Sequence, residues 1–117
     1  MSANETARIR ELNDAFRRAP ELSAQRASLN RLCVTRGVAD HGPAFMARAL
    51  ARVRSFEEFT PGDDPYQEHD FGAFTLDGER LFWKIDCYDL AGAYHSPDPA
   101  DPLVTRRVLT IMLASEY

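Results

Sequence analysis

Residues 63–89, which read DDPYQEHDFGAFTLDGERLFWKIDCYD, decide the fold of this chain. An Asp-Gly pair at positions 77 and 78 separates two runs that are rich in aromatic and β-branched residues. This pattern is typical of a β-hairpin with a two-residue type I′ turn, in which both turn residues take positive φ angles. The sequence therefore predicts strands over residues 68–76 and 79–88, joined at Asp77-Gly78.

A two-residue turn also fixes the register of the two strands. Because the side chains of a strand alternate between the faces of a sheet, one face of this hairpin is expected to be apolar and to form the core. That face carries Phe74, Leu81, Trp83, Ile85 and Cys87. Gly72 falls opposite Trp83, where its missing side chain leaves room for the indole ring to lie across the neighbouring strand.

The opposite face of the hairpin has a mixed composition, so we expect it to be only partly covered. It carries His69, Phe71, Phe82, Lys84, Asp86 and Tyr88. The register places His69 opposite Asp86, which would make either a structural cross-strand pair or an oriented general base or metal ligand. A one-residue slip or a bulge would abolish this pair.

Two further acids, Glu68 and Asp70, fall on the apolar face near its open end. Carboxylates at such a position must be exposed, hydrogen-bonded or paired, because burying them alone is costly. The arginines of the N-terminal half are candidate partners, Arg36 in particular. The alternatives are an arginine–carboxylate network that ties the helices to the sheet and a functional pocket.

Two amphipathic helices are predicted before the hairpin, over residues 6–18 and 43–56, because apolar residues recur there at helical spacing. The first helix is expected to direct its charged side chains, Asp14 and Arg17 among them, away from its apolar face. Residues 32–35 form a short strand candidate between the two helices.

The other segments are less regular. Residues 21–29 are weakly patterned and fit either a loop or an extra turn of helix, and residues 57–67 form an acidic loop with turn residues throughout. Residues 104–117 favour a strand over a helix. The sequence thus predicts one α+β domain over residues 1–117, in which a small antiparallel sheet packs against two amphipathic helices.

Charge is distributed unevenly along the chain. Residues 1–56 hold ten arginines and five acids, whereas residues 57–103 hold twelve acids against Arg80 and Lys84 alone. Clustered acids repel nucleic acids and steer a protein toward basic partners. We therefore expect a partner-binding surface that is formed by Asp63, Asp64, Glu68, Asp70, Asp86 and Asp89.

Two alternative functions use other residues. His69, Asp86 and Asp89 could form the metal site of a small enzyme, since oxygen-rich ligand sets with one histidine suit Mg²⁺, Mn²⁺ or iron. Arg48, Arg52 and Arg54 could bind phosphates, although a solvated helix face explains them as well. No phosphate-binding loop, dinucleotide fingerprint, zinc-protease motif or nucleophile elbow is present, and we expect no cofactor.

Cysteine usage and hydropathy suggest an intracellular protein. Cys33 and Cys87 lie in strand-like runs and are expected to be buried free thiols, because a disulfide would require neighbouring strands. No apolar run is long enough to span a membrane, and the N-terminus lacks the apolar core of a signal peptide. A cytoplasmic location follows from these two observations.

Several motifs resemble a bacterial family of proteins of unknown function, numbered 3768. They are DPYQEHDFGAF, LFWKID-x-YD and SPDPADP-x-x-T-x-RVLTIMLASEY, with IRELNDAFR and VTRGV nearer the N-terminus. Members of the family are short proteins that are frequent on alphaproteobacterial plasmids and integrated elements. An aromatic residue is usual there at the position of Cys87, which argues against a family-wide catalytic thiol.

The resemblance implies a setting among antirestriction-like genes but no established activity and no catalytic residues. Our leading hypothesis is a non-enzymatic interaction protein of a mobile genetic element, which inhibits host defence in the manner of an anti-CRISPR or antirestriction protein. Its partner would be a protein with a basic surface, such as a CRISPR or restriction component, and direct binding of nucleic acid is not expected. An exposed edge strand could also mediate homodimerisation.

Overall fold

The computed structural model describes residues 2–20 and 29–117, so most of the weakly patterned segment 21–29 lies outside the described residues. The helices and strands follow one another in the order α1 (Ala3–Arg18), β1 (Arg31–Val34), α3 (Arg36–Ala39), α4 (Pro43–Arg54), β2 (Phe71–Leu76), β3 (Glu79–Tyr88), β4 (Arg106–Leu113) and the 3₁₀ helix η1 (Ala114–Glu116). The predicted α+β fold is confirmed.

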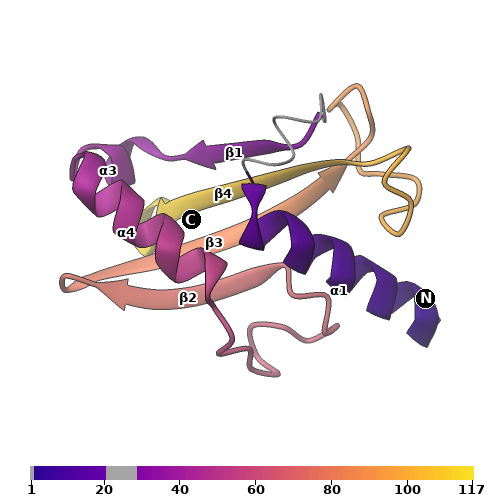
Figure 1. Ribbon diagram of the computed structural model, residues 1–117, viewed down its shortest axis with the longest axis horizontal. Coiled ribbons are helices and arrows are strands. Elements are labelled where there is room, and N and C mark those ends of the chain that lie inside the picture. Colours follow the sequence, from indigo (N-terminus) through magenta and orange to yellow (C-terminus); the bar gives the residue numbers. More distant parts are fainter. Residues whose placement is uncertain (1, 21–28) are drawn as a thin grey trace.

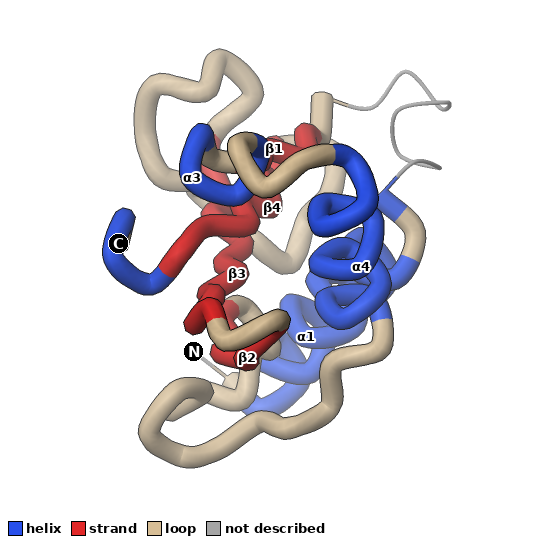
Figure 2. Tube along the Cα trace, turned by 90° about the vertical axis from the view of Figure 1, so that its left-hand side faces the viewer, coloured by secondary structure: helices blue, strands red, loops and turns tan. Residues whose placement is uncertain are grey.

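One four-stranded sheet has the order β1-β4-β3-β2. Helices α1 and α4 cover one of its faces, and η1 lies on the other side of the sheet (Figures 1 and 2). The sheet is mixed rather than antiparallel, because β1 pairs with β4 in parallel while the other two pairs are antiparallel. A parallel pair needs a long crossover connection, which the intervening helices and hairpin supply here.

The hairpin has the predicted turn and register. Asp77 and Gly78 both have positive φ angles, of 52° and 80°, and Gly72 lies opposite Trp83. Strand β2 begins at Phe71, three residues later than predicted. The predicted strand within residues 104–117 is confirmed as β4.

The core lies between the sheet and the two helices, around the fully buried Trp83. Phe56 and Phe59 contact the Trp83 indole edge-on, with ring centroids 5.5 and 6.1 Å away. Cys87 is half-buried beside this core, but Cys33 is exposed because β1 is an edge strand. The prediction of a buried thiol is therefore wrong for Cys33.

The most buried charged residue of the described chain is Arg17, whose exposed fraction is 0%. Its Nη1 donates to the backbone carbonyls of Val53 and Phe56, at 2.8 and 3.0 Å, where α4 ends. Its Nη2 forms an ion pair of 2.8 Å with Asp14. The prediction that Arg17 avoids the apolar face of its helix is wrong, because these acceptors satisfy the guanidinium inside the protein.

No helix among the described residues is both long enough and apolar enough to cross a lipid bilayer.

Replacing Gly72 with alanine is expected to destabilise the protein by roughly 1–3 kcal/mol, the usual effect of overpacking a core. A Cβ atom at this position would lie 2.3 Å from Trp83 Nε1 and 2.7 Å from the Phe56 ring. Urea denaturation measures the change in free energy of unfolding. Gly62→Ala is the matched control, because nothing lies within 4 Å of its added Cβ; equal effects of the two substitutions would contradict the packing argument.

Replacing Arg17 with methionine is expected to lower the free energy of unfolding by about 3–5 kcal/mol, as for other broken buried ion pairs. The substitution leaves the carbonyls of Val53 and Phe56 without their donor. Arg18→Met on the exposed side of the same helix is the control, with an expected change within about 0.5 kcal/mol. Similar denaturation midpoints for the two variants would show that Arg17 does not join α1 to α4.

Candidate functional site

An acidic loop of residues 57–70 connects α4 to β2. Asp64 organises this loop from inside, since it is only 5% exposed. Its backbone N–H donates to the Thr60 carbonyl at 2.7 Å, and its Oδ1 accepts the backbone N–H of His69 at 3.1 Å. The Asp64 carboxylate therefore faces the protein and cannot serve as the surface contact that we predicted.

His69 lies beside α1 and not beside Asp86. Its Nδ1 is 3.0 Å from both carboxylate oxygens of Asp14, and its Nε2 is 3.7 Å from Asp64 Oδ2. The imidazole stacks on Phe59 with a centroid distance of 3.7 Å. The predicted His69–Asp86 pair is wrong because the chain has not yet entered β2: His69 has a φ of 54°, in the left-handed region, which directs its ring toward the helix.

The predicted metal ligands do not converge. Asp86 pairs with Lys84 at 2.8 Å. Asp89 caps a turn, where its Oδ1 accepts the backbone N–H groups of Ala93 and Tyr94 at 3.0 and 3.3 Å. Within residues 2–20 and 29–117, no group of three or more histidines, cysteines or acids is placed to hold a metal ion. The prediction of a site from His69, Asp86 and Asp89 is therefore wrong.

The predicted arginine ridge of α4 is bonded to the hairpin. Both Nη atoms of Arg48 donate to the carboxylate of Asp77 in the hairpin turn. This bidentate contact raises the pKa of Arg48 and lowers the pKa of Asp77. Arg52 donates to the Thr75 carbonyl at 3.2 Å, and its guanidinium lies over the Phe74 ring. Arg54, the third predicted phosphate ligand, is half-buried at the end of the helix.

Glu68 and Asp70 are half-buried acids without a basic partner in the described part of the chain. Burial raises the pKa of Glu68, and the carboxylates of Asp70 and Asp64 raise it further. Burial likewise raises the pKa of Asp70. The expected partner Arg36 is exposed and lies 3.9 Å from Asp40 instead, because it belongs to α3.

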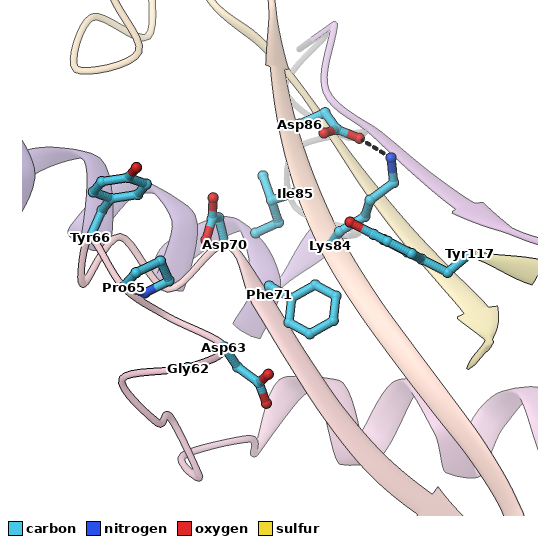
Figure 3. A pocket seen from close by; sticks show the side chains of 10 residues that line it. All are labelled: Gly62, Asp63, Pro65, Tyr66, Asp70, Phe71, Lys84, Ile85, Asp86 and Tyr117. Carbon is cyan, nitrogen blue, oxygen red and sulfur yellow. Dashed lines mark ion pairs between the residues drawn. The ribbon is translucent and has the colours of Figure 1, made fainter.

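Asp70 lines a hollow of about 410 Å³ between the acidic loop and the sheet (Figure 3). The register placed Asp70 and Asp86 on opposite faces, yet both line this hollow because Asp70 precedes β2. Its other lining residues are Gly62, Asp63, Pro65, Tyr66, Phe71, Lys84, Ile85 and Tyr117. The sequence gives no signal for Tyr66 and Tyr117, since chain folding alone brings them to the same place.

Glu116 fixes Tyr117 at the hollow. Its carboxylate accepts hydrogen bonds from the Thr35 hydroxyl at 2.6 Å and from the backbone N–H groups of Gly37 and Leu113 at 3.0 and 2.8 Å. These bonds, the Thr35 hydroxyl first, lower the pKa of Glu116. The Tyr117 ring meets Phe71 edge-on at 6.1 Å.

A family model described as "Protein of unknown function (DUF3768)" matches residues 34–116. The chain belongs to the DUF3768 family. The resemblance seen in the sequence is thereby confirmed for this segment, whereas the IRELNDAFR motif of α1 precedes the match. No curated protein and no solved structure matches the chain. In this DUF3768 protein the hollow lies within the matched segment, except that Tyr117 follows its last residue by one position.

Replacing Asp70 with asparagine, or Glu68 with glutamine, is expected to stabilise the protein at pH 7. Because both folded-state pKa values are raised, ionisation disfavours the folded form. The wild-type free energy of unfolding therefore falls as the pH rises from the unfolded-state pKa, about 4, through the folded-state pKa. Denaturation from pH 3 to 8 measures the effect, and the gain should vanish below about pH 3.5, where the unfolded carboxyls are protonated.

Asp63→Asn is the matched control for these two substitutions, because Asp63 is exposed on the same loop. Its free energy of unfolding should stay within about 0.5 kcal/mol of the wild type. A loss of stability in Asp70→Asn at pH 7 would mean that a favourable contact holds the ionised carboxylate.

Proposed function

We propose that this DUF3768 protein is a non-enzymatic interaction protein that binds a basic protein surface through Asp63, Glu68 and Asp70. The observation that carries the proposal is that no arginine or lysine of the described chain pairs with these three acids. By contrast, Asp77 and Asp86 each have a basic partner. The acidic loop therefore presents a charge that the protein itself does not neutralise.

The destabilisation of the fold by these ionised carboxylates supports a role for them in binding. The raised pKa values of Glu68 and Asp70 mean that their ionised forms weaken the fold at neutral pH. Side chains that destabilise a protein are commonly those that its function requires. A basic partner would neutralise these carboxylates and would remove the electrostatic cost on binding.

The small size of the proposed acidic contact favours binding to one local basic surface over imitation of a DNA duplex. Duplex DNA carries a charge about every 1.7 Å along its axis, whereas Asp63, Glu68 and Asp70 lie close together in one loop and cover a small patch. The basic ridge of α4 supports no second function, because Arg48 and Arg52 already bond to the hairpin. The scattered positions of His69, Asp86 and Asp89 likewise leave the metal-enzyme hypothesis without support.

We further propose that the partner is a nucleic-acid-handling component of host defence, such as a CRISPR or restriction protein. Proteins that bind phosphates expose lysine and arginine, and such surfaces attract unneutralised carboxylates. The resemblance to a family that is frequent on mobile elements supports this choice of partner. Occupying the phosphate-binding surface would inhibit the partner by competition with its nucleic acid.

The test compares the wild-type protein with the variant Asp63→Asn/Glu68→Gln/Asp70→Asn as baits in a bacterium that carries CRISPR and restriction systems. A nucleic-acid-handling protein should be enriched by the wild type and lost with the variant. The purified pair should then bind in a salt-dependent way, because exposed charges are screened by salt. The wild type, unlike the variant, should restore plaque formation by a restricted phage.

Glu5→Gln/Glu11→Gln/Asp101→Asn is the charge-matched control, because it removes three acids outside the loop. It should keep both partner capture and phage protection. Equal capture by all three baits, or no protection by the wild type, would refute the proposed function.

A further inference from the structure

The hollow beside the acidic loop combines negative charge with aromatic walls. The acids come from the acidic loop, which carries Asp63 and Asp70, and from β3, which carries Asp86. Lys84 is the one basic residue among the lining residues of the hollow. Since Lys84 already pairs with Asp86 at 2.8 Å, two carboxylates are left for a ligand. The hollow thus suits a single cationic group.

The aromatic residues of the hollow come from three places. Tyr66 belongs to the acidic loop, Phe71 begins β2, and Tyr117 follows η1. Figure 3 shows Tyr66 and Tyr117 on opposite sides of Asp70 and Phe71. Tyr66 is 76% exposed, so its ring is accessible to a ligand or a partner. Aromatic faces attract cations, and guanidinium groups most often.

We propose that this hollow binds one arginine side chain of the basic partner, a proposal that rests on the function proposed above. The guanidinium donates hydrogen bonds to the carboxylate of Asp70, its planar face lies against Tyr66, and Asp63 adds negative charge at the edge of the hollow. Arginine fits better than lysine, because a planar fork can bond a carboxylate and stack on a ring together, whereas an ammonium is a compact, strongly hydrated charge.

The walls of the hollow are in place before any ligand arrives. Glu116 holds the segment that carries Tyr117 through three hydrogen bonds, and Lys84 and Asp86 hold each other. A preformed site loses little conformational entropy when a ligand enters. Only Tyr66, on the exposed loop, needs to adjust to the incoming side chain.

The experiment uses N-acetyl-arginine amide as the probe, followed by ¹H–¹⁵N chemical shifts of the full chain. N-acetyl-citrulline amide, which has the same shape without the charge, and N-acetyl-lysine amide are the comparison probes. The arginine probe should shift the amide signals of Phe71, Lys84, Asp86 and Tyr117. The citrulline probe should leave them in place, and the lysine probe should bind at least about threefold more weakly.

Two variants assign the binding to the hollow. Asp70→Asn should weaken the arginine probe at least about fivefold, because it removes a charge-assisted hydrogen bond, and Tyr66→Ala should weaken it about threefold. The matched controls are Glu58→Gln, an exposed acid of the same loop, and Tyr94→Ala, which is 77% exposed outside the hollow. Both controls should bind the probe like the wild type.

The outcomes separate this proposal from the proposed function. Equal shifts with arginine and citrulline, or unchanged binding to Asp70→Asn, would overturn the arginine site even if the partner still depends on the acidic loop. The proposed function would fail by itself if the arginine probe bound in the hollow while all three baits captured the same proteins.

Discussion

The fold depends on one buried cation. The guanidinium of Arg17 donates to carbonyls at the end of α4, where a helix leaves its last acceptors without intrahelical donors and carries partial negative charge. It also lies 5.2 Å from the Trp83 ring at the centre of the core. A single side chain of α1 thereby satisfies the end of α4 and packs on the sheet, so this one residue connects both helices to the sheet.

The same cation determines where the acidic loop lies. Arg17 shares Asp14 with His69, and His69 in turn contacts Asp64 and stacks on Phe59. The contacts among Arg17, Asp14, His69 and Asp64 thus hold the acidic loop against α1. What the loop displays outward is the set of acids that this network leaves over, which is why the charged surface is narrower than the acidic composition of the segment suggests.

The sequence predicted correctly those features of the fold that depend on residues adjacent in the chain. The Asp77-Gly78 pair was enough for the turn and the register, because few residue pairs tolerate two positive φ angles. The predicted His69–Asp86 pair was wrong because His69 has a positive φ angle. A residue other than glycine adopts this conformation through tertiary contacts, which the sequence pattern does not reveal. Arg17 was misplaced for a related reason: whether a charge is buried depends on acceptors that come from distant segments.

The parallel pairing of β1 with β4 has a consequence for synthesis on the ribosome. Among the described strands β1 bonds only to β4, which is made after the other three, and Arg107 of β4 also bonds to Asn13 of α1. Strand β1 therefore lacks its sheet partner while most of the chain emerges. Contacts between such distant segments slow folding and prolong the time for which the edge of the unfinished sheet stays unpaired.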